Sequence, residues 1–105
     1  MDRKKTIIKN LKRFKKEISQ EIKVDKMIFF GSRMYGKPRR HSDIDIIVVS
    51  KKFNKLRFIK RSFELYKKWD LNYPVDILCY TPKEFNSLKK QITIVREAVK
   101  RGIEI

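Results

Sequence analysis

Hydrophobic residues follow a helical period in the first part of the chain. Between residues 4 and 21 apolar side chains recur every three or four positions, with lysine and glutamate between them, which predicts an amphipathic helix. The apolar positions of this stripe, with the one that follows it, are Ile7, Ile8, Leu11, Phe14, Ile18 and Ile22. The lysines between them are expected on the face that is in contact with water.

Three apolar runs with strand character follow this helix. Residues 24–30 (VDKMIFF) predict a strand that ends at Gly31. Residues 44–49 (IDIIVV) are almost wholly β-branched and apolar, which is typical of a strand that is covered on both faces. Residues 74–80 (PVDILCY) predict a third strand, and the polar residues 32–42 predict a loop between the first two.

Two more helices are predicted from periodic apolar positions. In residues 53–69 these positions are Phe53, Leu56, Phe58 or Ile59, Phe63, Tyr66 and Trp69, which predicts one helix that crosses back over the sheet. Thr81 and Glu84 form the capping-box pattern T-x-x-E, so we expect the last helix to begin there and to end at Gly102. Its apolar positions are Phe85, Leu88, Ile92, Val95 and Val99.

The predicted order of elements indicates an α/β (α+β) fold with a small mixed sheet and helices packed against it. The segment 53–69 is long enough to connect two parallel strands, whereas the shorter loop before residue 44 can join antiparallel neighbours. Residues 1–105 contain no internal repeat and no interdomain linker, so we expect a single domain.

Charge and cysteine content narrow the class of protein. The 28 Lys and Arg against 12 Asp and Glu give a net charge of +16, which attracts phosphates, nucleic acid or an acidic protein partner. The lysines are spread along the chain, so a charge-rich surface of the kind found in hyperthermophile proteins is an equal alternative.

The single cysteine, Cys79, lies in an apolar run and predicts burial in a reducing environment. Without a long apolar segment or a signal peptide, we expect a soluble cytoplasmic protein that makes no membrane contact.

Three aspartates accompany the second and third strands. Asp43 and Asp45 are two residues apart and point to the same face, and Asp76 joins them if the two strands are neighbours in register. Close carboxylates repel each other unless they share a cation, and Mg²⁺ prefers such oxygen ligands. Taken alone, the S-D-I-D segment can instead cap the preceding loop, and Asp76 can pair with a lysine.

A Gly-Ser turn precedes the aspartates by ten residues. Gly31 lets backbone N–H groups approach a triphosphate closely, and the hydroxyl of Ser32 can bond to it. The basic residues that surround this turn are Arg33, Lys37, Arg39 and Arg40. Phosphate charge suits such a group of cations.

The run GSRMYGKPRRHSDIDIIVV resembles the signature of the DNA polymerase beta nucleotidyltransferase superfamily, and the short chain is similar to its minimal nucleotidyltransferases. The resemblance covers about residues 24–80 and depends on the spacing G-S-x10-D-x-D. It implies a mixed-sheet palm fold that uses Mg²⁺, with two ions expected, and ATP or another nucleoside triphosphate as substrate. In this family a nucleotidyl group is transferred to a hydroxyl and pyrophosphate is released.

The resemblance also implies roles for individual residues. Gly31 and Ser32 match the triphosphate-binding turn, and Arg33 follows them as it does in many minimal members. Asp43 and Asp45 match the metal ligands. Asp76 matches the third carboxylate, which binds the catalytic metal and assists deprotonation of the attacking hydroxyl.

Minimal nucleotidyltransferases often occur as antitoxins beside a HEPN-domain toxin, and some transfer AMP to a tyrosine of that toxin. The resemblance therefore implies an antitoxin that transfers AMP from ATP to a HEPN partner. Two alternatives stay open. One is an antitoxin that acts only by binding, through the aromatic residues at 63–69 and the C-terminal helix with the GIEI segment. The other is a nucleotidyltransferase directed at nucleic acid, which the charge suggests.

Overall fold

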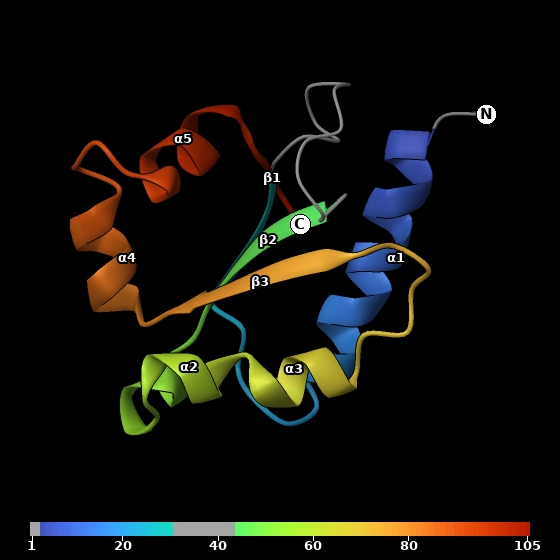
Figure 1. The fold of residues 1–105 in the computed structure, drawn as a ribbon, viewed down its shortest axis with the longest axis horizontal. Coiled ribbons are helices and arrows are strands. Elements are labelled where there is room, and N and C mark those ends of the chain that lie inside the picture. The colour runs from blue at the N-terminus through green and yellow to red at the C-terminus, as the bar shows by residue number, and fades with distance from the viewer. Residues whose placement is uncertain (1–2, 31–43) are drawn as a thin grey trace.

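The computed structural model describes residues 3–30 and 44–105, so the predictions for Gly31, Ser32, Arg33 and Asp43 lie outside the described residues. The elements, shown in Figure 1, are α1 (Arg3–Ile18), β1 (Lys26–Phe30), β2 (Ile44–Val49), η1 (Lys51–Lys55), α2 (Phe58–Arg61), α3 (Phe63–Lys67), β3 (Val75–Tyr80), α4 (Pro82–Leu88), α5 (Ile94–Arg101) and β4 (Ile103–Glu104).

A four-stranded mixed sheet in the order β3-β2-β1-β4 forms the centre of the fold. β1 and β2 are antiparallel, with Phe29 opposite Ile46, whereas β2 and β3 are parallel. The chain therefore crosses over from β2 to β3 through residues 51–67, as the length of that segment predicted. The predicted mixed sheet with helices packed against it is confirmed.

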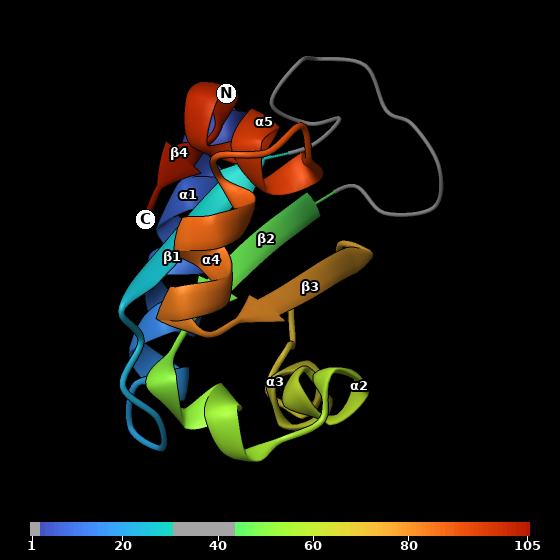
Figure 2. The same ribbon diagram turned by 90° about the vertical axis from the view of Figure 1, so that its left-hand side faces the viewer.

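Helices cover both faces of the sheet. On one face Ile44, Ile46 and Val48 pack in a core with the apolar stripe of α1, whose predicted burial is confirmed. On the other face Ile47 and Val49 pack in a core with residues of α4 and α5. Figure 2 shows α4 and α5 in front of the sheet and α1 behind it. β2 is thus covered on both faces, which explains why its sequence is almost wholly apolar.

The prediction of one helix over residues 53–69 is wrong. The chain leaves the helical conformation at Leu56 (φ −120°, ψ 144°) and Arg57 (φ −64°, ψ 148°), so three short helical segments replace one long helix. This break resets the helical phase, and residues spaced for one continuous helix do not share a face. Phe58, Ile59 and Phe63 are consequently 53, 81 and 60% exposed. The buried side chains of the segment are Phe53, Arg61 and Leu65.

The prediction of one C-terminal helix is also wrong. Thr93 is extended (φ −140°, ψ 169°) and its side chain accepts a hydrogen bond from the N–H of Arg96, so it begins a separate helix, α5. Ile92 lies in the turn between α4 and α5 and is 93% exposed. The new phase buries Ala98 in place of the predicted Val99.

Gly102 ends α5 as predicted, and the chain then forms a short strand, β4, that the residue pattern does not predict. Ile103 in β4 pairs with Phe29 in β1. A Cβ atom at Gly102 would lie 2.7 Å from Cγ2 of Ile28 and 2.9 Å from the carbonyl oxygen of Phe29. Glycine is therefore required for this close approach of the chain to β1.

Candidate active site

Asp45 and Asp76 lie side by side on parallel strands. The register of β2 and β3 places Asp45 directly beside Asp76, on strands that are about 4.8 Å apart in such a sheet. Because both residues have the same place in the pleat, their side chains leave the same face of the sheet. The neighbouring Ile46 and Ile77 point to the opposite face and are buried. The predicted convergence of these two aspartates is confirmed.

The pair lies at the amino ends of the strands, where solvent reaches it. Asp45 is half-buried and Asp76 is exposed, and each is the second residue of its strand. Within residues 3–30 and 44–105 no group of three metal-binding side chains comes together, and the third predicted ligand, Asp43, lies outside that part of the chain. Two adjacent carboxylates offer the oxygen donors that Mg²⁺ prefers, so the residues present fit such an ion.

The residues that lead into β3 are held by aromatic contacts. The indole N–H of Trp69 donates to the carbonyl of Tyr73 at 2.9 Å. The Trp69 ring also packs edge-on against Phe14, with ring centroids 5.0 Å apart. These contacts tie the segment before Asp76 to α1.

Tyr66 contacts the strand beside Asp76. Its hydroxyl oxygen accepts a hydrogen bond from the backbone N–H of Ile77 at 2.9 Å. The apolar spacing of residues 53–69 predicts Tyr66 on the core side of a helix. No spacing rule connects a side chain on a crossover helix with a particular backbone group of the next strand. Sequence reasoning therefore missed this residue.

Arg61 and Glu84 form a second contact that the sequence did not indicate. The Arg61 guanidinium, 8% exposed, binds both carboxylate oxygens of Glu84 at 2.5 and 3.2 Å and also donates to the carbonyl of Cys79. Glu84 accepts a further hydrogen bond from the N–H of Thr81, which confirms the predicted capping box. The hydrogen bond from Arg61 holds the pKa of Glu84 below its ordinary value.

Cys79 is buried, as its apolar surroundings predicted. Burial raises the pKa of its thiol to about 12, against a smaller opposing effect of the Arg61 charge. The thiol is therefore protonated at neutral pH, which does not suit a nucleophile.

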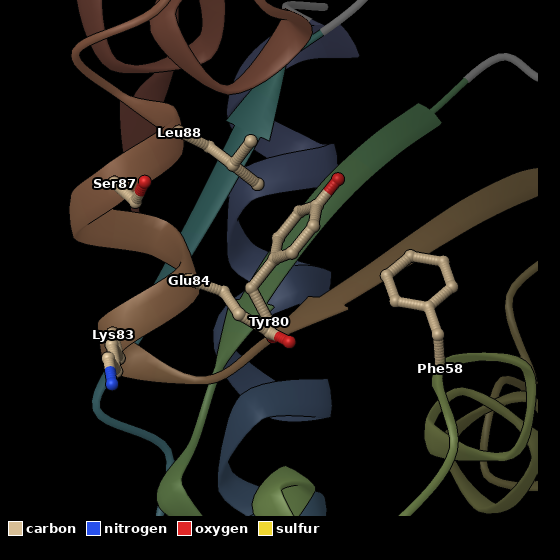
Figure 3. Close-up of a pocket in the computed structure, with 6 residues that line it drawn as sticks. All are labelled: Phe58, Tyr80, Lys83, Glu84, Ser87 and Leu88. Atoms are coloured by element: carbon tan, nitrogen blue, oxygen red, sulfur yellow. The ribbon is translucent and has the colours of Figure 1, made fainter.

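A pocket of about 400 Å³ lies at the other end of β3, between α2 and α4. Figure 3 shows the ring of Tyr80 between Leu88 on α4 and Phe58 on α2. The rings of Phe58 and Tyr80 are 5.7 Å apart. Tyr80 is the last residue of β3, whereas Asp76 is near its start, so this pocket is separate from the aspartate pair.

No helix in the described part of the chain is both long and apolar enough to cross a membrane.

The family model for the nucleotidyltransferase domain matches residues 11–100, a span that includes both aspartates and the predicted Gly-Ser turn. The chain belongs to the nucleotidyltransferase domain family. It is therefore an enzyme of the transferase class, with a nucleoside triphosphate as the substrate that the family implies.

Two relatives of this nucleotidyltransferase have names that specify the transferred group. "Probable protein adenylyltransferase MntA" of Haemophilus influenzae is 29% identical over 94 residues, which cover 85% of this chain and 81% of that protein. "Putative protein adenylyltransferase MJ0141" of Methanocaldococcus jannaschii is 31% identical over 71 residues, which cover 66% of this chain and 72% of that protein.

Solved structures support the fold. A crystal structure named as a putative nucleotidyltransferase from Sulfolobus solfataricus matches with a TM-score of 0.61 at 23% identity, over 91% of this chain and 76% of that one. BolA1 from Arabidopsis thaliana matches with a TM-score of 0.52 at 19% identity, over 70% of this chain and 92% of that one. Because the second match has a different name, the arrangement of elements alone does not define the activity.

Proposed function

We propose that this nucleotidyltransferase transfers AMP from ATP to a hydroxyl group of a protein, with Mg²⁺ held by Asp43, Asp45 and Asp76. The observation that supports this most is the placement of Asp45 beside Asp76 on one face of the sheet. The names of the two relatives, both protein adenylyltransferases, support the choice of AMP and of a protein acceptor. Residues 1–105 are proposed to form one such domain, acting in the cytoplasm.

In the proposed reaction the acceptor oxygen attacks the α-phosphorus of ATP. The bond from that phosphorus to the oxygen that bridges the β-phosphorus breaks, and pyrophosphate leaves. Asp76 accepts the proton of the attacking hydroxyl, while Gly31, Ser32 and Arg33 hold the triphosphate. Bound Mg²⁺ would neutralise the charge that develops on the phosphate oxygens.

The proposed acceptor is a tyrosine of a HEPN-domain toxin, and the proposed biological role of this chain is that of its antitoxin. The exposed side chains of Phe58, Ile59 and Phe63 on α2 and α3 offer an apolar surface for a protein partner. The same surface supports the second candidate, an antitoxin that acts by binding alone. The GIEI segment, whose Ile103 and Glu104 pair with β1 at the edge of the sheet, stays part of this second candidate.

The test is a transfer assay with Mg²⁺ and ATP labelled at the α-phosphate, with and without the HEPN protein. We expect label on the partner, and a loss of at least about 100-fold in Asp76→Asn, because a general base contributes on that order or more. Asp70→Asn is the matched control, since Asp70 is an exposed aspartate in an ion pair with Arg13. Asp45→Asn is expected to behave like Asp76→Asn.

Three outcomes decide between the candidates. Transfer that persists in Asp76→Asn would contradict the assigned role of that residue. A stable complex with the partner without any transfer would favour the binding antitoxin. Label on added RNA rather than on protein would favour a nucleic-acid acceptor.

A further inference from the structure

The two edges of β3 have different partners. The carbonyls of Pro74 and Tyr80 accept hydrogen bonds from the N–H groups of Ile44 in β2 and of Ser50 directly after it, at 3.2 and 3.0 Å. Because the backbone groups of a strand alternate in direction, those of Asp76 also face β2, whereas those of Ile77 face outward. β3 is the terminal strand of the sheet, so no strand of the described chain lies on that outer side.

Tyr66 takes the place of a neighbouring strand at Ile77. The N–H that Ile77 donates to the Tyr66 hydroxyl belongs to the same planar peptide group as the carbonyl of Asp76. The Asp76 carbonyl of this peptide faces β2, and its N–H, which belongs to Ile77, is bonded to Tyr66. The orientation of the peptide sets the direction of the Cα–Cβ bond of Asp76, and therefore the position of its carboxylate.

Packing of the neighbouring residues holds Tyr66 in place. The preceding residue, Leu65, is buried in the core with α1. Three residues later, Trp69 packs against Phe14. Arg61 makes a second bond to the outer edge of β3, to the carbonyl of Cys79 at 3.3 Å, whereas Tyr66 bonds to the peptide next to the aspartate.

We propose that Tyr66 is a positioning residue for Asp76 that acts through the peptide group between Asp76 and Ile77. The inference rests on the proposed function, because it takes Asp76 as a ligand of the catalytic metal. Tyr66 is 41% exposed, so water can replace its hydroxyl at the Ile77 N–H when that hydroxyl is removed. We therefore expect Tyr66→Phe to keep the fold. The peptide nevertheless loses its fixed attachment to α3, so we expect the position of the carboxylate to change.

The test compares Tyr66→Phe, Asp76→Asn, the double variant and the control Tyr80→Phe, which removes a hydroxyl from the far end of the same strand. Mn²⁺ affinity is measured by electron paramagnetic resonance with a non-hydrolysable ATP analogue, and kcat and KM are measured in the transfer assay. We expect Tyr66→Phe to weaken Mn²⁺ binding and to lower kcat, each about tenfold, the lower end for residues that orient metal ligands. The KM for ATP should change less than about twofold, because the triphosphate is assigned to the Gly-Ser turn.

The double variant separates positioning from a general effect on stability. If Tyr66 acts through Asp76, adding Tyr66→Phe to Asp76→Asn changes Mn²⁺ affinity by less than about twofold. An equal loss in both backgrounds would overturn the inference, as would wild-type affinity and kcat in Tyr66→Phe. Tyr80→Phe is expected to match the wild type in every readout.

Two measurements separate this inference from the proposed function. Amide hydrogen exchange on the wild type should show a protected Ile77 N–H, and rapid exchange there would overturn the inference without any variant. If the wild type transfers no nucleotide but its Mn²⁺ affinity depends on Tyr66 through Asp76, the proposed function fails and the inference stands.

Discussion

Arg61 and Glu84, 23 residues apart in the chain, form a two-point ion pair that joins α2 to the first turn of α4. The guanidinium is 8% exposed, whereas the carboxylate is 41% exposed. The end of β3 runs between these helices, and its Cys79 carbonyl bonds to the same guanidinium. The crossover, the strand and the following helix are therefore held at one point.

Glu84→Gln should destabilise the protein by about 1–3 kcal/mol at pH 7, because it leaves a largely buried guanidinium without its charged partner. The measurement is urea unfolding. Glu64→Gln is the matched control, since Glu64 pairs with Lys67 where both side chains are exposed, and its effect should stay below about 1 kcal/mol. Equal effects of the two changes would contradict the structural role of the Arg61 pair.

The same pair predicts an acid-dependent loss of stability. The pKa of Glu84 is lowered in the folded state, so its contribution is fully present above the ordinary value of 4.5 and is lost as the pH falls through the lower folded value. Unfolding measured from pH 6 downward should therefore show the stabilities of wild type and Glu84→Gln converging below pH 4.5, as the pH falls through the lower folded pKa. A constant difference at every pH would show that the carboxylate charge is not responsible.

Asp76→Asn should leave the free energy of unfolding within about 0.5 kcal/mol of wild type, because Asp76 is exposed. Mg²⁺ with a non-hydrolysable ATP analogue should stabilise the wild type by up to about 2.7 kcal/mol when the ligand concentration is 100 times Kd, which raises its Tm. The Tm of the variant should rise less. Removal of Mg²⁺ with a chelator should abolish the difference. An equal Tm increase in both proteins would argue against metal binding at Asp76.

Gly102→Ala should destabilise the protein by about 1–3 kcal/mol, the usual cost of overpacking. The added methyl group would meet the Ile28 side chain at 2.7 Å and would press β4 away from β1. Chemical unfolding measures the loss, and Lys100→Ala on the exposed side of α5 should be nearly neutral. Neutral behaviour of Gly102→Ala would mean that β4 moves without cost.

Ile59→Asp should weaken the complex with the HEPN protein at least tenfold, because a charge would enter the apolar surface of α2 and α3. Isothermal titration calorimetry measures the affinity. Ile92→Asp is the matched control, since Ile92 is also a largely exposed isoleucine and lies in the α4–α5 turn. If only Ile92→Asp weakens the complex, the partner binds at the α4–α5 turn instead.

The first three strands and their pairing were predictable because β2 is almost wholly apolar and the crossover is long. Once β2 and β3 were taken as parallel neighbours, alternation alone placed Asp45 and Asp76 on one face. The capping box of α4 was equally local, since Thr81 and Glu84 are three residues apart.

The helices that follow β2 and β3 were harder to predict, because apolar spacing does not reveal where a helix breaks. Leu56 and Thr93 each reset the phase, which exposed Phe58, Ile59 and Ile92. The partners of Arg61 and Tyr66 are set by tertiary packing. Neither the strand carbonyl that binds Arg61 nor the N–H that binds Tyr66 has a signature in the residue types.

The hydrogen bonds of Tyr66 and Arg61 to the outer edge of β3 also bear on self-association. The strand sequence VDILCY is short, rich in β-formers and carries one charge, which is the composition of segments that stack into cross-β assemblies. Tyr66 and Arg61 occupy backbone groups that a strand from another molecule would need. Detachment of α2 and α3 from the sheet would thus free these backbone groups to pair with a strand of another molecule.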